Sequence, residues 1–526
     1  MAYAQHFSTK KTPQTQPIPG KEMVENNAGG HSFAVSKWTS LDRFLILGSQ
    51  GGSYYASEKK LTVDNAEKVI ECIKEDGRRV VKTIVGVSLG GRAPKNDPAI
   101  FALALCSTFG DELTKMTAYF AISKVCRIGT HIFQFCAEVN KLRGWGRGLR
   151  SGVSRFYTGR KEEDLAHQLI KYQQRNGWTH RDVLRLAHPS PLTPEMRNLF
   201  AYAVGKPAEG RLPAQIEAFE KIKSLTASDH KKAVELILEY RLPRECVPTV
   251  LLNNASVWEA LLAEMPLTAM IRNLGKMTSV GVLGSNLSVA TKDVVKKLTD
   301  AEYVSRSRVH PLNVLIAGKI YAQGHGEKGS LNWSPLSAIN DALDDAFHLA
   351  FDSVEPVGKS FFLGVDVSGS MTSRMNHLPL TYSEAAAAMA MVAVRTEPHT
   401  EVYGFDTGLK SIPLNKKHTF AQAAKMVAGY NGGGTDCALP MLYALKEKIP
   451  VDVFQVYTDN ETWAGEVHPV QALQEYRQRM GIPAKLVVFG MAADEFTIAD
   501  PNDAGMLDVV GLDSSVPAAV ASFLTA

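Results

Sequence analysis

FFLGVDVSGSM, residues 361 to 371, is the stretch that says most about the fold of this chain. Its apolar beginning is typical of a strand buried within a parallel sheet, where both faces of the strand are covered. The run ends in three oxygen-bearing side chains, Asp366, Ser368 and Ser370. Because ligands of open α/β sheets bind beyond the carboxyl ends of the strands, these side chains are expected at a binding site. One carboxylate and two hydroxyls suit Mg²⁺, which prefers octahedral oxygen ligands and keeps several waters.

Two later segments carry further oxygen side chains. The loop NGGGTD, residues 431 to 436, offers the Thr435 hydroxyl, and the apolar run VDVFQVYTDN, residues 451 to 460, brings Asp459 to a strand end. Taken alone, DVSGSM is also compatible with a plain serine-glycine turn. Three matching elements in one order favour a metal site over that interpretation. Aspartyl-phosphate chemistry is disfavoured, because it needs a second carboxylate where Ser368 stands.

The surrounding segments alternate between strand and helix patterns. Continuous apolar runs predict strands, and apolar residues spaced at 3.6-residue intervals predict helices. The expected strands cover residues 361–366, 399–407, 451–458 and 484–492, and the expected helices residues 383–395, 419–430, 438–448 and 469–481. Such alternation is typical of an α/β doubly wound, mostly parallel sheet, which we expect over residues 358–526.

The order D-x-S-x-S, then Thr, then Asp resembles the metal-ion-dependent adhesion site of von Willebrand factor A domains. The resemblance implies a von Willebrand factor A-like domain whose ligands bind the ion directly or through water. It also implies that one coordination position stays open to a carboxylate from a partner. The implied ligands are Asp366, Ser368, Ser370, Thr435 and Asp459.

Composition sets further bounds on this chain of 526 residues. No apolar run approaches the roughly 18 residues of a membrane span, so no membrane partner is expected. Residues 1–20 are polar and lack an apolar signal region, so a mobile tail is expected there. The six cysteines show no C-x-x-C spacing and most lie in apolar helical patterns, which predicts buried, reduced thiols and a cytoplasmic protein.

Charge is distributed unevenly along the chain. Residues 359–526 carry 12 Lys and Arg against 18 Asp and Glu, whereas residues 1–358 carry 46 against 36. Residues 141–190 are the most basic segment, with 11 basic and 4 acidic side chains. Such asymmetry predicts a nucleic-acid surface on the first part of the chain, although a solvated basic helix face gives the same pattern.

Residues 60 to 350 are expected to be mostly helical. Apolar residues recur at helical spacing in one segment after another, and short turns with Gly, Pro, Asp or Thr separate the segments. Antiparallel helices repeated along a chain are typical of an α-solenoid, which offers extended binding surfaces. The sequence shows no clean repeat period, so the helix rhythm alone supports this prediction.

The basic residues of two segments, 141–157 and 169–188, are the candidate RNA contacts. Lys171 and Arg175 are four residues apart, as are Arg181 and Arg185, so each pair is expected to share a helix face that contacts phosphates. Nearby tryptophans and histidines either stack on unpaired bases or belong to the core. The candidates are Arg147, Arg150, Lys171, Arg175, Arg181, Arg185 and His188.

Several segments together, among them GRAPKNDPAIFALALCS, YQQRNGWTHRDVLRLAHPSP and RVHPLNVLIAGKIYAQGHG, resemble the TROVE module of the Ro autoantigen family, bacterial members included. In that family TROVE precedes a von Willebrand factor A domain. The resemblance implies an α-helical ring of HEAT-like repeats over residues 21–357. It also implies Y RNA on the basic outer surface, single-stranded 3′ ends of misfolded or precursor RNA in a central hole, and a 3′ exoribonuclease partner. By this resemblance, Lys171, Arg175 and His188 match the Y RNA contacts. Arg147 and Arg150 are candidate RNA contacts because of their charge alone.

These observations predict a monomeric, non-enzymatic RNA-binding protein that acts in RNA quality control, processing and decay and holds Mg²⁺ in its A domain. A metal-dependent protein-adhesion scaffold, which recruits partners through the A domain, is the alternative. A metal-dependent nuclease is a third class. Loss of RNA binding on changing the basic residues, loss of a protein complex on changing Asp366, and shortening of RNA in Mg²⁺ distinguish the three.

Overall fold

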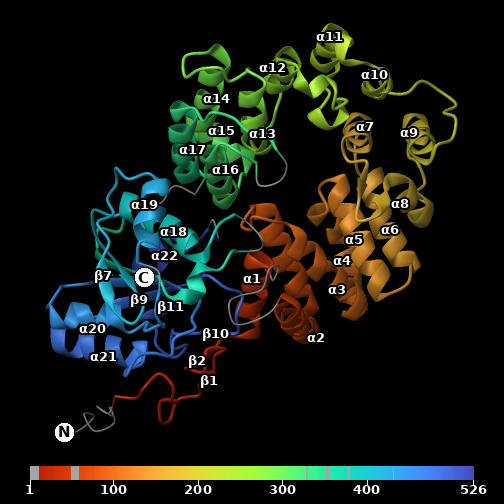
Figure 1. Ribbon diagram of the computed structural model, residues 1–526. Helices are drawn as coiled ribbons and strands as arrows, with labels where there is room; N and C mark the ends of the chain where they lie inside the picture. Colours follow the sequence, from red (N-terminus) through yellow and green to blue (C-terminus); the bar gives the residue numbers. More distant parts are fainter. Residues whose placement is uncertain are drawn as a thin grey trace. The chain divides into compact units, whose positions relative to one another are not determined.

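The computed structural model describes residues 11–48, 58–326, 330–350, 356–375, 379–430, 432–513 and 515–525. The chain divides into two compact units (Figure 1). The helical unit comprises Ala66–Ala350, and the sheet unit comprises Met1–Asn65 together with Phe351–Ala526. No helix among the described residues is long and apolar enough to cross a membrane. All six cysteines are buried and free, as predicted.

The helical unit consists of short helices that pack on their neighbours in the chain, for example α3 on α5, α4 on α6 and α16 on α17. Most of these helices bury one apolar stripe, as the 3.6-residue spacing predicts, whereas α3 is buried on all sides over residues 102–107. In chain order the helices are α2 (Glu58–Gly90), α3 (Asp97–Phe109), α4 (Glu112–Val125), α5 (Gly129–Leu142), α6 (Arg147–Thr158), α7 (Glu162–Lys171), α8 (His180–Ala187), α9 (Pro194–Val204), α10 (Ala214–Lys223), α11 (His230–Tyr240), α12 (Ala255–Ala263), α13 (Leu267–Ser279), α14 (Val289–Thr299), α15 (Ala301–Ser307), α16 (Pro311–Gln323) and α17 (Ser337–Leu349).

The two ends of this helical array contact each other. Arg308 Nη1 donates to the Leu89 carbonyl at 3.3 Å, and Asn313 Nδ2 donates to the Pro94 carbonyl at 3.2 Å. The ring nitrogen Nε2 of His310 lies 3.0 Å from the Arg92 carbonyl oxygen. These bonds join the end of α2 and the loop after it to residues more than 200 positions later. The helical unit is therefore a closed array, in agreement with the predicted ring of helical repeats.

The sheet unit is built on a sheet of order β11-β9-β8-β5-β6-β7, in which all neighbours are parallel except β6 and β7. Helices lie between β5 and β6, before β8, and between β8 and β9, as in the predicted doubly wound domain, whereas the short strand β10 (Phe496–Thr497) and loops connect β9 to β11. The strands are β5 (Ser360–Asp366), β6 (His399–Phe405), β7 (Leu409–Ser411), β8 (Val453–Thr458), β9 (Lys485–Gly490) and β11 (Met506–Val510), and the helices are α18 (Tyr382–Thr396), α19 (Phe420–Ala428), α20 (Leu439–Lys446), α21 (Pro469–Met480) and α22 (Val516–Thr525).

The beginning of the chain folds with the sheet unit and not with the helical unit. Strand β2 (His31–Ala34) pairs with both β1 (Val24–Glu25) and β10 (Phe496–Thr497). Helix α1 (Lys37–Leu47) buries Arg43, which binds both carboxylate oxygens of Asp508 at 2.8 Å. The expected helical domain covered residues 21–357. In the structure, residues 21–48 belong to the sheet unit instead.

The mobile tail expected over residues 1–20 is wrong for residues 11–20. The side chain of Gln14 is fully buried, donates to Asp436 Oδ1 at 2.7 Å and donates to the Val467 carbonyl at 2.8 Å. Thr12 N also donates to the Gln471 side chain at 3.1 Å. These hydrogen bonds hold the segment against the sheet unit, because a buried polar group that gives up its bonds to water needs a protein partner in their place. Residues 1–10 lie outside the described residues.

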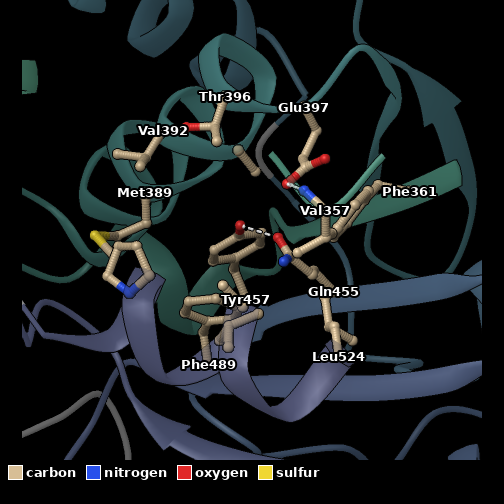
Figure 2. A pocket seen from close by; sticks show the side chains of 14 residues that line it. Val357, Phe361, Met389, Val392, Thr396, Glu397, Gln455, Tyr457, Phe489 and Leu524 are labelled. Atoms are coloured by element: carbon tan, nitrogen blue, oxygen red, sulfur yellow. Dashed lines mark hydrogen bonds between the residues drawn. The ribbon is translucent and has the colours of Figure 1, made fainter. Parts of the chain in front are cut away.

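A small cavity lies between α18, α22 and the sheet (Figure 2). Its lining includes Phe361, Met389 and Phe489, and at its rim Glu397 accepts from Val357 N at 3.0 Å. The cavity volume is about 40 Å³, which accommodates a few waters at most. We interpret this space as a packing gap of the apolar core and not as a ligand site.

Candidate metal site and RNA-binding surface

The loop after β5 holds the first three predicted metal ligands in fixed positions. Ser368 N donates to Asp366 Oδ1 at 2.9 Å, and the hydroxyls of Ser368 and Ser370 lie 3.1 Å apart. All three side chains are buried. The short helix that follows, Gly369–Thr372, turns the chain immediately after the strand, so the three side chains converge at the carboxyl end of β5.

The neighbouring strand β8 brings the fourth ligand to the same edge of the sheet. Thr458, the last residue of β8, donates from its hydroxyl to Asp366 Oδ2 at 2.6 Å. Asp459 follows directly, is buried, and accepts a hydrogen bond from the Ser370 side chain. The parallel pairing of β5 with β8 accounts for this convergence, since both strands end on one side of the sheet.

The glycine loop supplies the fifth ligand. Gly432 N donates to the Val367 carbonyl at 3.0 Å, and Gly369 N donates to the Gly433 carbonyl at 3.3 Å, so this loop lies along the first one. Gly433 has a φ of 73°, which a residue with a side chain rarely adopts. The Thr435 hydroxyl is fully buried and has no hydrogen-bond partner among the described residues. A buried hydroxyl without a partner, on a loop that lies along residues 367–369, is consistent with the role of cation ligand.

The electrostatics of the site also fit a divalent cation. Burial and the nearby Asp459 charge raise the pKa of Asp366 to about 7. Burial also raises the pKa of Asp459, and burial with the charges of Asp494 and Asp459 raises the pKa of Glu461 to about 9. Buried like charges repel each other, and a cation relieves that repulsion. Within the described ranges, no three or more His, Cys, Asp or Glu side chains are grouped so as to hold a metal, and the ligand set predicted here consists of two carboxylates and three hydroxyls.

All five predicted ligands thus meet at one edge of the sheet, and their role as ligands stays a prediction. Sequence reasoning missed the segments that support them. Gln14 binds Asp436, which follows Thr435, and Asn27 donates to Glu461 at 2.9 Å. The ring of Trp463 packs against Gly434, while the Trp463 backbone N–H donates to the Thr435 carbonyl at 3.0 Å. Trp463 was detectable only as an aromatic residue four positions after Asp459.

The structure corrects the expected face that pairs Lys171 with Arg175. Helix α7 ends at Lys171, and Arg175 lies in β3 (Gln174–Arg175), which pairs with β4 (Trp178–Thr179). Asn176 and Gly177 form the turn with φ of 52° and 76°. Asn-Gly is the strongest short-range sequence signal for such a tight hairpin turn, and it was the signal in the sequence that indicated a hairpin here instead of a continued helix. Arg175 is nevertheless exposed, whereas Lys171 is half-buried.

Lys171 borders a large hollow of the helical unit. The hollow has a volume of about 600 Å³ and lies between α7, α10 and the α11–α13 region. Its walls carry charges of both signs, including Glu163, Arg241 and Glu245. Lys171 therefore lies where a ligand is able to approach, although the mixed charges make this hollow less favourable for phosphate than the exposed arginines.

The second expected pair does share a helix. Arg181 and Arg185 are both exposed on α8, which begins at a Thr179–Asp182 capping box. His188 ends α8 in the left-handed conformation, with a φ of 48°, and its side chain is exposed. These three side chains therefore extend from one short helix of eight residues and from the residue that caps its C-terminus.

Helix α6 carries Arg147 and Arg150, and both side chains are exposed. The nearby Trp145 and Trp178 are half-buried, with ring centroids 6.1 Å apart. His180 is buried, its Nδ1 lies 3.0 Å from the Tyr157 hydroxyl, and burial lowers its pKa to about 4. His180 is therefore a neutral core residue and not a contact for bases.

Comparisons with known proteins agree with both units. A family model described as the Ro60 vWA domain matches residues 360–524, and a TROVE domain model matches residues 24–243 and 210–320. The chain is 38% identical over 597 residues to "RNA-binding protein RO60" of Caenorhabditis elegans, covering 98% of this chain and 92% of that protein. The chain belongs to the Ro family. The TROVE match begins within β1, so the Ro family's first module contributes residues to the sheet unit.

Bacterial relatives of the Ro family match equally broadly. "RNA-binding protein RO60" of Deinococcus radiodurans is 41% identical over 519 residues, covering 97% of each chain. The crystal structure of Deinococcus radiodurans RO (RSR) protein superimposes with a TM-score of 0.70 at 39% identity, covering 93% of this chain and 99% of that one. At this coverage, the similarity to the bacterial structure extends over both the helical array and the sheet unit.

Proposed function

We propose that this protein is a non-enzymatic RNA-binding protein of the Ro type. The observation that carries the proposal is the exposure of basic side chains on α6, on α8 and on the β3–β4 hairpin, within a segment of 11 basic and 4 acidic residues. Cationic surfaces of this kind bind nucleic acid by releasing counterions from phosphates. The names of the worm and bacterial relatives, which match over nearly the whole chain, support the same class of ligand.

In this proposal, small noncoding RNAs of the Y type bind Lys171, Arg175, Arg181, Arg185 and His188. Single-stranded 3′ ends of misfolded or precursor RNA bind within the closed helical array. A 3′ exoribonuclease then receives the bound RNA for processing or decay. The closure of the array by Arg308, His310 and Asn313 supports this division, because a closed array has an outer and an inner surface.

The double variant Lys171→Ala plus Arg175→Ala tests the proposal. Affinity for a structured RNA should fall about tenfold, and the slope of log K against log salt should shrink by about 0.7 to 0.9 per lost phosphate contact. The matched control is Lys231→Ala plus Lys232→Ala, which removes two exposed lysines of α11. Filter binding or anisotropy measures both. Equal affinities in the two double variants would contradict the proposed surface, and RNA shortened by the protein in Mg²⁺ would contradict a non-enzymatic role.

We further propose that the sheet unit binds Mg²⁺ through Asp366, Ser368, Ser370, Thr435 and Asp459 and thereby recruits a partner carboxylate. The orphaned Thr435 hydroxyl and the raised pKa of Asp366 support the cation. Trp463 supports a docking role, because its side chain is partly exposed on the loop that contacts Thr435. A metal-dependent adhesion function on this site is compatible with RNA binding by the other unit.

Terbium provides a direct probe, because Tb³⁺ occupies oxygen-rich cation sites and luminesces when a nearby tryptophan is excited. Tb³⁺ luminescence should appear on titration, should be displaced by Mg²⁺, and should be lost in Asp366→Ala. Trp463→Phe should reduce the luminescence without weakening Mg²⁺ competition. Glu447→Ala, which removes an exposed carboxylate of the same unit, is the control. Equal luminescence in Asp366→Ala and Glu447→Ala would contradict the site.

A further inference from the structure

Helix α4 exposes a stripe of large apolar side chains that the RNA-binding proposal does not use. Leu113, Met116 and Phe120 are 52%, 50% and 53% exposed, and Phe109, at the end of α3, is 47% exposed. Residues 113, 116 and 120 are spaced i, i+3 and i+7, so they lie on one face of α4. A contiguous exposed patch of this kind marks an interaction site more often than scattered single residues do.

The stripe faces outward because the opposite face of α4 is tightly packed. Thr114 is buried, and a Cβ at Gly77 of α2 would lie 2.3 Å from its hydroxyl oxygen. On another side, a Cβ at Gly152 of α6 would lie 2.9 Å from the Tyr119 carbonyl oxygen. Glycines at these contacts allow α2 and α6 to approach α4 closely. The rotation of α4 about its axis is therefore set by packing, and the exposure of the stripe follows from it.

Positive charge borders the stripe. The Arg155 guanidinium of α6 lies 3.9 Å from the centroid of the Phe120 ring, and Arg147 is exposed two turns earlier on α6. Lys124 is exposed in the last turn of α4. Within α4 and its cap, the acidic residues lie at the other end, where Asp111 caps the helix by accepting from Thr114 N at 2.7 Å, followed by Glu112.

We propose that this stripe, Phe109, Leu113, Met116 and Phe120, docks an acidic amphipathic helix of a protein partner. Helices that pack on one another make contact through apolar side chains spaced at i, i+3 and i+7. The basic border complements acidic residues beside the apolar face of the incoming helix. RNA fits less well, because Leu113 and Met116 offer no ring for base stacking and Arg155 covers a face of Phe120. A second copy fits less well because its own Arg155 would repel the first.

The size of the stripe predicts a weak, reversible complex. Half-exposed side chains of this number offer roughly 400 Å² of apolar surface. A stable protein interface buries about 800 Å² on each partner. We therefore expect a dissociation constant of about 10 to 100 μM for an isolated helix, which longer partners lower through further contacts.

A designed peptide tests the proposal on the full-length protein. The probe is a labelled 18-residue helix with leucine at i, i+3 or i+4 and i+7 and glutamate beside them, and its control has the same composition in scrambled order. Anisotropy should show binding of the probe and not of the scrambled peptide. Met116→Glu should weaken binding at least tenfold. Leu238→Glu, which changes an equally exposed leucine of α11 (52% exposed), should leave it unchanged.

Three results would overturn the inference. One is equal binding of the probe and the scrambled peptide, or equal binding to both variants. Another is a loss of affinity for an oligouridylate in Met116→Glu but not in Leu238→Glu, which would assign the stripe to RNA. The last is a dimer of the wild-type chain in sedimentation equilibrium that Met116→Glu dissociates, which would assign it to a second copy. Thermal unfolding of both variants confirms that each folds.

Discussion

The candidate metal-site loops of the sheet unit and the basic surface of the helical unit are built in opposite ways. The candidate ligand side chains are buried, and hydrogen bonds join segments around them that are far apart in sequence. The basic side chains are mostly exposed and extend from short elements that lie close together in sequence. A buried polar site depends on every partner, so one change affects both stability and binding. Exposed charges act more independently, so changes there affect binding alone.

The largest expected effect concerns the anchoring of α1 on the sheet unit. Arg43→Ala leaves Asp508 without its cation and frees the carbonyls of Asp494 and Phe496, which Arg43 Nη1 reaches at 2.7 and 2.8 Å. We expect the free energy of unfolding to fall by about 3–5 kcal/mol, measured by urea denaturation. Arg479→Ala removes an exposed ion pair with Glu475 at 3.1 Å and should cost under about 1 kcal/mol. Similar losses in both variants would contradict the contrast between buried and exposed groups.

An intermediate effect is expected from pH. The pKa of Asp366 is raised from 3.8 to about 7 and that of Glu461 from 4.5 to about 9, so the folded chain binds more protons than the unfolded chain between these values. In EDTA, the unfolding free energy should therefore fall as pH rises from about 4 to 9, by a few kcal/mol. Saturating Mg²⁺ should flatten the part of this decline that Asp366 causes. Identical pH profiles of the melting temperature with and without Mg²⁺ would contradict cation binding at this site.

The smallest expected effect tests whether the two regions are independent. Asp366→Ala should change RNA affinity by less than about twofold at 150 mM salt, because the basic side chains belong to the other compact unit and sites without shared partners act additively. Filter binding against the wild-type chain measures the difference. A fall in RNA affinity as large as that of Lys171→Ala plus Arg175→Ala would instead indicate a contact between the metal and an RNA phosphate.

The candidate metal site was predictable because its information is local. Each ligand directly follows an apolar strand or a glycine loop, and parallel strands bring their carboxyl ends together wherever they pair. The basic surface was only partly predictable. Arg181 and Arg185 share α8 as their spacing indicates. Arg175 instead lies on a hairpin, because α7 ends at Lys171 and the Asn176–Gly177 turn, with both residues in positive φ, pairs β3 with β4.

The sequence by itself determined that one unit is helical and the other α/β. It also determined which oxygen-bearing side chains follow the strands and the glycine loop, and the sign of each unit's net charge. These follow from short-range patterns of apolar, polar and glycine residues. Only the tertiary structure decided that Gln14 and Arg43 support the sheet unit, that Arg308 and His310 close the helical array, and that α4 leaves an apolar stripe exposed. These features join residues far apart in the chain, and their polar groups find partners only when folding removes them from water.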